Sequence, residues 1–119
     1  MLEISQTFNF DAAHQLGHGA PENRRMHGHS FQAEVVLRGE TNAQGFLRDF
    51  GDVDATLKAI RDLLDHRLLN EVEGLGIPTL ENLARFIHTR AKAALPEVAR
   101  VTVRRPSYGQ SCTYEDAEG

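Results

Sequence analysis

The stretch HGHSFQAEVVLR, residues 27–38, holds the clearest strand pattern of this chain and two of its six histidines. Apolar and polar side chains alternate over residues 30–38, with Val36 as the one exception. Such alternation is typical of a strand with one buried face. Residues 2–10, LEISQTFNF, alternate in the same way apart from Gln6. The two segments therefore predict two strands, which a hairpin would place side by side.

Three histidines lie where these strand-like segments end and begin. His27 and His29 are two residues apart, so in a strand they share a face, and a hairpin returns His14 beside them. Three imidazoles with no fourth protein ligand are the arrangement of a catalytic zinc site with an open position. A structural zinc site more often uses cysteine, and the chain has only Cys112. A histidine on a strand is usually packed or solvated, so the spacing alone leaves zinc ligands and ordinary histidines as alternatives.

Composition restricts the class of protein. At 119 residues, with 40% hydrophobic and 25% charged residues, we expect one globular domain spanning residues 1–119. The net charge of −4 and the lack of a basic run argue against nucleic acid as a partner. No stretch reaches the ~20 apolar residues of a membrane span, and the first residues do not resemble a signal peptide. With one cysteine, a reducing cytoplasm is the expected location.

The rest of the chain predicts two helices and three further strands. Helical spacing of Val53, Leu57, Ile60 and Leu64 predicts a first helix that ends near Asp65. We expect a second helix to begin at the N-cap Thr79 and to stop before Pro96. The expected strands are a short one at 46–50, a longer one at 98–105 and a short final one at 112–114. We expect His18 to be a bystander in a loop and His88 to lie on the surface of the second helix.

This order of elements predicts the α+β class, with an antiparallel four-stranded sheet and two helices on one face. The other face carries Glu3, Ser5, Thr7, Gln32 and Glu34, so we expect it to be wet. A small sheet with two free edges usually has them covered or paired. Assembly of several copies edge to edge is therefore a reasonable expectation.

The chain resembles the 6-pyruvoyltetrahydropterin synthase family, which includes the bacterial 6-carboxytetrahydropterin synthases of queuosine biosynthesis. The resemblance runs over about residues 4–104, in the right order, and the combination of F-x-A-A-H with H-G-H-S-F is specific. The segments that carry it are FDAAH at 10–14, MHGHSF at 26–31, GFLRDF at 45–50, LDH at 64–66 and PTLENLA at 78–84.

The resemblance implies a fold, an assembly and a chemistry. It implies the tunnelling fold, in which trimers close into a barrel and two trimers stack as a homohexamer. It also implies zinc bound by His14, His27 and His29, and a small pterin-like substrate such as dihydroneopterin triphosphate. An Asp–His pair then moves protons, and here the matching residues are Asp65 and His66. Without the resemblance, these two residues read more simply as the end of a helix.

Two departures from the family pattern affect the expected chemistry. Asn23 stands about where a cysteine base is expected, and an amide does not titrate. Glu22 can substitute as the base, although a solvated loop carboxylate is an equally good reading; Cys112 is not an obvious replacement. Arg105 stands where the family normally has a glutamate that grips the amino-pyrimidine edge, and a guanidinium offers only donors. Arg105 is then either solvated or part of a pocket for an acceptor or anion, and Glu115 is a second candidate for the clamp.

Three functions follow from these residues. The leading hypothesis is a zinc-dependent pterin-type lyase related to 6-carboxytetrahydropterin synthase, with dihydroneopterin triphosphate or a related compound as substrate. The alternative is a divergent homologue that keeps fold and zinc but acts as a ligand-binding or partner subunit. A zinc hydrolase of another substrate class is the third.

Overall fold

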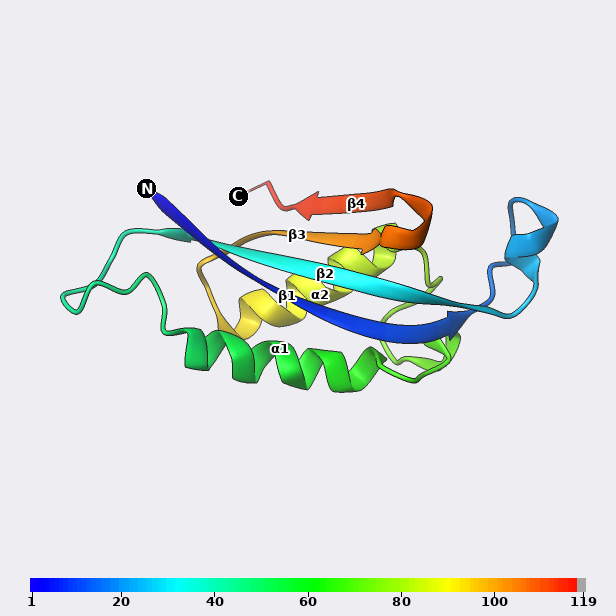
Figure 1. Ribbon diagram of the computed structural model, residues 1–119, viewed down its shortest axis with the longest axis horizontal. Coiled ribbons are helices and arrows are strands. Elements are labelled where there is room, and N and C mark those ends of the chain that lie inside the picture. The colour runs from blue at the N-terminus through cyan, green and yellow to red at the C-terminus, as the bar shows by residue number, and fades with distance from the viewer. Residues whose placement is uncertain (118–119) are drawn as a thin grey trace.

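The protein is built on one antiparallel sheet of four strands, with two α-helices on the same side of it (Figure 1). The computed structural model describes residues 1–117. The strands follow chain order, β1-β2-β3-β4, and each pairs with the next. Their bounds are β1 Leu2–His14, β2 His27–Gly39, β3 Val98–Arg105 and β4 Gln110–Glu115. The helices are α1 Phe50–Leu64 and α2 Leu80–Ala94, with short 3-10 turns η1 Pro21–Arg24, η2 Leu69–Glu71 and η3 Pro106–Tyr108. This confirms the predicted fold class.

The long β1–β2 hairpin forms as the alternation predicts, and it extends beyond the predicted ends. Pairing runs without a break from Leu2 opposite Gly39 to His14 opposite His27. The side chains that face the helices are buried on both strands, including Phe10 and Phe31, whose rings stack 5.0 Å apart. Beyond the predicted ends, residues 11–14 and 27–29 stay in the ladder because the backbone groups of each strand pair with those of the other.

The strand predicted at 46–50 is wrong. Residues 40–49 form turns, in which the Asn42 carboxamide oxygen accepts hydrogen bonds from the backbone N–H groups of Gln44 and Phe46. The Asp49 carboxylate then accepts from the Gly51 N–H and caps α1, which begins at Phe50. These polar side chains satisfy local donors that a strand would have paired with a neighbour.

The two helices bury the residues that their periodicity indicates. Val53, Leu57, Ile60 and Leu64 of α1 lie in the core. The N-cap of α2 is confirmed, because the Thr79 hydroxyl accepts from the Asn82 N–H at 3.1 Å. Neither helix, at 15 residues, is long and apolar enough to cross a membrane, and no other helix in residues 1–117 is.

The prediction that His88 lies on the surface is wrong. Its side chain is buried and stands edge-on to the Tyr114 ring, with centroids 4.9 Å apart. Its Nε2 lies 3.9 Å from the Asp116 carboxylate. The reason is β4, which is longer than predicted and covers this side of α2.

The face of the sheet away from the helices is polar, as expected. Glu3 reaches across β2 to a bidentate ion pair with Arg100, at 2.8 and 2.9 Å, and Glu34 pairs with Arg104 at 2.9 Å. The hydroxyls of Thr102 and Thr113 lie 2.7 Å apart. Within the described residues, these pairs link all four strands across this face.

Candidate metal centre

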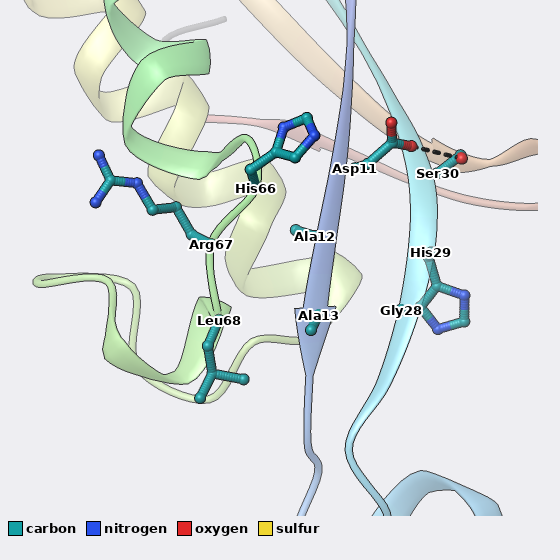
Figure 2. Close-up of a pocket in the computed structure, with 9 residues that line it drawn as sticks. All are labelled: Asp11, Ala12, Ala13, Gly28, His29, Ser30, His66, Arg67 and Leu68. Atoms are coloured by element: carbon teal, nitrogen blue, oxygen red, sulfur yellow. Dashed lines mark hydrogen bonds between the residues drawn. The ribbon is translucent and has the colours of Figure 1, made fainter.

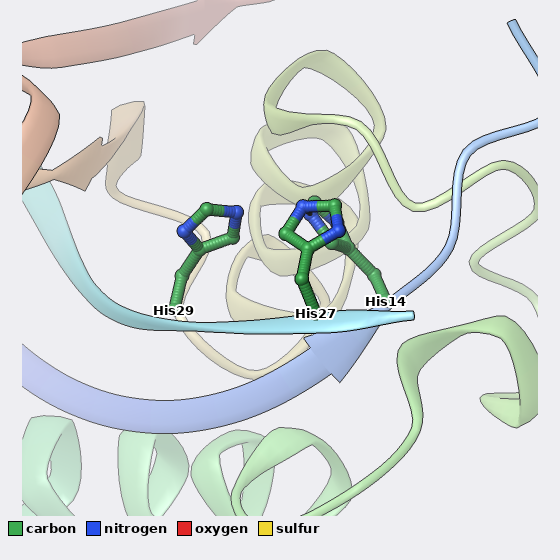
Figure 3. A group of neighbouring side chains, drawn as sticks. All are labelled: His14, His27 and His29. Atoms are coloured by element: carbon green, nitrogen blue, oxygen red, sulfur yellow. Dashed lines mark hydrogen bonds between the residues drawn. The ribbon is translucent and has the colours of Figure 1, made fainter. Parts of the chain in front are cut away.

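The three histidines singled out by their spacing meet at one end of the sheet (Figure 3). His14 is directly opposite His27 in the hairpin, and His29 is opposite Ala12. Because side chains alternate along a strand, all three rings rise from the same face, which is the face that carries the core. His14 is 1% and His29 8% exposed, while His27 is half-buried. The predicted convergence of the three rings is confirmed.

Backbone carbonyls fix which nitrogen of two rings points to the centre. His14 Nδ1 donates to the Pro78 oxygen at 2.9 Å, and His27 Nδ1 donates to the Arg25 oxygen at 2.7 Å. A carbonyl only accepts, so both Nδ1 atoms carry the proton and both Nε2 atoms of the neutral rings carry a lone pair. These two Nε2 atoms lie 2.9 Å apart. Two lone pairs at this distance repel each other unless a cation lies between them.

His29 completes the group with a third nitrogen that the protein leaves unpaired. Its Nε2 is buried and has no hydrogen-bond partner within residues 1–117. Burial lowers the pKa of His29 to about 4, with further contributions from His14 and Arg105. Burial also lowers the pKa of His14. Both rings are therefore neutral at pH 7, which is the form that binds metals.

The geometry and chemistry of the three rings fit a metal ion. One ligand atom from each histidine lies within 4.8 Å of the others. The nitrogen ligands of a tetrahedral zinc lie about 3.3 Å apart, at Zn–N distances of about 2.0–2.1 Å. A carbonyl that accepts a hydrogen bond from Nδ1 is also the usual support of a metal-binding histidine. The group can therefore hold a metal ion, with a ligand position left open.

Asp65 and His66 form an ordered pair at the end of α1. The Asp65 carboxylate accepts from His66 Nδ1 at 2.8 Å and from the Asp11 N–H at 2.9 Å. Arg61 Nη2 adds an ion pair at 3.1 Å. The hydrogen bond from Asp11 is the largest cause of the lowered pKa of Asp65, followed by that from His66. Asp65 is thus ionised and holds His66 with Nε2 free.

His66 is also held in an uncommon backbone conformation. Its φ of 58° lies in the left-handed region, which costs a non-glycine residue of order 1 kcal/mol or more. Its N–H donates to the Asp11 oxygen at 2.7 Å, so the turn is fixed to the outer edge of β1. The imidazole itself is mostly exposed. This turn presents the ring to solvent on a rigid support.

His66 and His29 lie on different sides of the hairpin (Figure 2). An open cavity of about 610 Å³ lies between the hairpin and the segment after α1. Asp11 and Ser30, which are hydrogen-bonded at 2.6 Å, line it from the face opposite the three rings. In Figure 2 the His66 and His29 rings lie on opposite sides of β1 and β2. Within one chain, the His66 ring therefore lies across the hairpin from the His29 ring, although both residues line this cavity.

The loop that carries the proposed base positions is closed by its backbone. Glu22 lies on η1 and is exposed, and its carboxylate has no hydrogen bond or ion pair within residues 1–117. The Asn23 backbone oxygen accepts a hydrogen bond from the Leu16 N–H, and the Asn23 backbone N–H donates to the Ala20 oxygen. The Asn23 carboxamide lies against Gly19, whose φ is 91°. A Cβ added at Gly19 would be 2.9 Å from Asn23 Nδ2. Asn23 therefore has a structural role in this loop.

Two other residues named from the sequence lie away from the centre. Cys112 is half-buried against the core, and burial raises the pKa of its thiol. In the β3–β4 ladder, Glu115 lies opposite Arg100, at the other end of β3 from Arg105. Within one chain, Glu115 therefore does not lie where it could replace the glutamate expected at position 105. His18 is exposed in the loop and is not part of the histidine group.

The sequence reasoning missed Tyr108 as a neighbour of the centre. Its ring stands edge-on to the His29 ring, with centroids 5.1 Å apart. The Arg105 guanidinium lies over the Tyr108 ring, 5.7 Å from its centroid. Tyr108 belongs to the turn between β3 and β4, which brings it back over β2. An aromatic residue in a Pro–Gly turn gave no signal of this placement.

Comparison with known proteins supplies a family and relatives. The family model described as 6-pyruvoyl tetrahydropterin synthase matches residues 3–117. The chain is 36% identical over 100 residues to 6-carboxy-5,6,7,8-tetrahydropterin synthase from Synechocystis, covering 79% of this chain and 78% of that protein. It is 38% identical over 88 residues to dihydroneopterin monophosphate aldolase from Pyrococcus furiosus, covering 74% and 73%.

A solved structure shares the fold over nearly the whole chain. The 6-pyruvoyl tetrahydropterin synthase of Caenorhabditis elegans superposes with a TM-score of 0.85, covering 98% of this chain and 96% of that one. The sequence identity is 23%, so this likeness bears on the fold alone.

Proposed function

Because the chain belongs to the 6-pyruvoyl tetrahydropterin synthase family, we propose that it is a zinc-dependent lyase of pterin-type substrates, related to 6-carboxytetrahydropterin synthase. We further propose that residues 1–119 act as a single domain in the cytoplasm and serve queuosine biosynthesis. The observation that carries the proposal is the convergence of His14, His27 and His29, with the Nε2 atoms of His14 and His27 2.9 Å apart.

Each residue of the centre has a defined task in this proposal. His14, His27 and His29 hold zinc through Nε2, and the Pro78 and Arg25 carbonyls keep two of the rings in the right tautomer. Bound there, zinc supplies Lewis-acid polarisation of substrate oxygens. Phe31 packs edge-on against the His14 and His29 rings, at 6.0 and 5.4 Å, and restricts their movement.

The Asp65–His66 pair is the proposed acid–base group. Asp65 holds the Nδ1 proton of His66, which leaves Nε2 to take a proton from the substrate or return it. Since His66 lies on the other side of the hairpin from the histidine group, the active site needs His66 from a second copy. This requirement favours the expected homohexamer, in which sheet edges pair and barrels form.

The departures at positions 23 and 105 favour an altered substrate. Asn23 cannot serve as a base, so proton abstraction falls to Glu22 or to His66 with Asp65. Arg105 opposes the amino-pyrimidine edge of dihydroneopterin triphosphate with positive charge. We therefore expect weak or undetectable turnover of this compound at normal zinc content. Introducing cysteine at position 23 and glutamate at position 105 should raise that turnover.

A second candidate function is a binding subunit that keeps zinc but has lost the chemistry. The exposed, unpaired carboxylate of Glu22 and the structural role of Asn23 favour it, because neither places a base at the centre of one chain. Loss of a general base costs about 10²–10⁴ in rate.

Turnover assays with zinc-loaded protein separate the two candidates. Dihydroneopterin, its monophosphate and its triphosphate are each incubated with wild type, with Asp65→Asn and with a His18→Gln control. The lyase proposal predicts product from at least one of them, lost in Asp65→Asn and kept in His18→Gln. Binding of these compounds without product supports the binding subunit. Turnover of the triphosphate at ~1 per second or faster contradicts our interpretation of positions 23 and 105.

A further inference from the structure

A second cavity lies against α2 and shares no lining residue with the cavity beside His66. It is open, measures about 540 Å³, and lies between residues 74–75 and one stripe of the helix. The side chains of this stripe follow helical spacing: Asn82, Arg85, Phe86, Thr89, Arg90 and Ala93. None of them belongs to the three-histidine group or to the Asp–His pair, so the cavity is separate from the proposed active site.

Two arginines line this cavity, and the protein gives neither of them a counter-charge. Arg85 and Arg90 form no hydrogen bond or ion pair within residues 1–117. On α1, by contrast, Lys58 and Arg61 each pair with a carboxylate four residues away, at 3.2 and 3.1 Å. Glu81 has the same spacing from Arg85, but no ion pair of 4.0 Å or less joins them in the described residues. Two uncompensated cations therefore give the cavity a positive potential.

Aromatic rings restrict both guanidinium groups. Arg90 lies over the Phe86 ring, 4.4 Å from its centroid, and Phe86 is itself only 7% exposed. Arg85 lies over the Tyr114 ring of β4, at 5.7 Å. A ring covers only the face of a guanidinium, so the N–H groups around its edge remain available. Because the side chains are already restricted, binding an anion costs less conformational entropy.

The segment before α2 forms the facing wall of the cavity. Asn82 Nδ2 donates to the Ile77 oxygen at 2.9 Å, which fixes this segment to the first turn of the helix. At Gly74, whose φ is 84°, an added Cβ would be 3.7 Å from Arg90 Nη2. The backbone thus passes close to this guanidinium. The Thr89 hydroxyl, which has no hydrogen bond within residues 1–117, adds a further donor to the lining.

We infer that this cavity binds the phosphate group of a small molecule through the guanidinium groups of Arg85 and Arg90. A phosphate monoester carries close to two negative charges at neutral pH, which two cations match. A guanidinium also binds phosphate oxygens through two parallel N–H bonds. The cavity exceeds the size of a phosphate group, and part of its lining is apolar: Leu75, Phe86 and Ala93. This lining favours an ester with an apolar group over inorganic phosphate.

Calorimetric titration of zinc-loaded protein with phenyl phosphate and with inorganic phosphate tests the inference. Sodium chloride holds the ionic strength constant, because salt screens exposed charges. Arg85→Gln and Arg90→Gln each remove one guanidinium from the cavity. Arg38→Gln is the matched control, because Arg38 is also exposed and without an ion pair within residues 1–117, but it does not line this cavity.

We expect wild type to bind phenyl phosphate with a Kd below about 1 mM. Arg85→Gln and Arg90→Gln should each raise this Kd by about 10-fold or more, as for the loss of hydrogen bonds to a charged group, and Arg38→Gln should keep it. Tighter binding of phenyl phosphate than of inorganic phosphate supports an ester, and equal binding supports the free ion at the same site.

Three results would overturn the inference: no binding of either compound, an unchanged Kd in Arg85→Gln and Arg90→Gln, or an equal loss in Arg38→Gln. An unchanged Kd in the two cavity variants would place the phosphate elsewhere, for example at the metal. None of these results bears on the histidine group, so the proposed function is tested separately.

Discussion

Acidification of the metal-free protein should destabilise it through His29. Burial holds the pKa of this ring at about 4 in the folded chain, against 6.5 for an ordinary histidine. Between these values the unfolded chain binds a proton that the folded chain does not, so stability is present above pH 6.5 and is lost as the pH falls towards 4. The full difference corresponds to about 3 kcal/mol, of which about 2 kcal/mol is lost by pH 5.

Denaturant unfolding of chelator-treated protein at pH 7 and pH 5 measures this loss. His29→Gln removes the titrating ring, so its loss between the two pH values should be about 2 kcal/mol smaller than that of wild type. His18→Gln removes an exposed histidine of the nearby loop and should behave as wild type. Equal losses in wild type and His29→Gln would refute the argument from burial.

Two further predictions concern assembly and the acid–base pair. Sedimentation at micromolar concentration should show a hexamer, because the proposed active site takes His66 from a second copy and the family resemblance implies six copies; finding monomer alone contradicts this. Asp65→Asn should lower turnover of the accepted substrate by about 10²–10⁴-fold while zinc content stays at the wild-type level, since His66 loses its orienting carboxylate; unchanged turnover would remove the pair from the mechanism.

Much of the fold could be predicted because alternation and helical periodicity are local signals. The β1–β2 pairing follows from two alternating segments, and β3 and the Thr79 cap lie where the sequence indicates. The predictions that failed depend on interactions that the local sequence pattern does not show. Residues 46–50 have strand-like side chains, but Asn42 and Asp49 satisfy backbone donors in turns. His88 looked exposed because nothing local indicates that β4 covers this side of α2.

In the candidate site, too, some features could be predicted from local sequence and others could not. The three histidines could be found because a two-residue spacing and a hairpin fix their relative positions. The carbonyl groups of Pro78 and Arg25 that set the tautomers could not, because any residue has a carbonyl. Tyr108 reaches His29 only through the path of the β3–β4 turn. The separation of His66 from the histidine group likewise depends on how the segment after α1 pairs with the edge of β1.

Metal analysis of purified protein measures whether the three histidines bind zinc. We predict one zinc ion per chain in wild type, bound by His14, His27 and His29. His27→Ala leaves two ligands and should lose most of the metal, while His18→Ala, in the adjoining loop, should keep it. Circular dichroism confirms that both variants are folded. Full zinc occupancy in folded His27→Ala, or no zinc in wild type after growth with the metal, would contradict zinc binding by these three histidines.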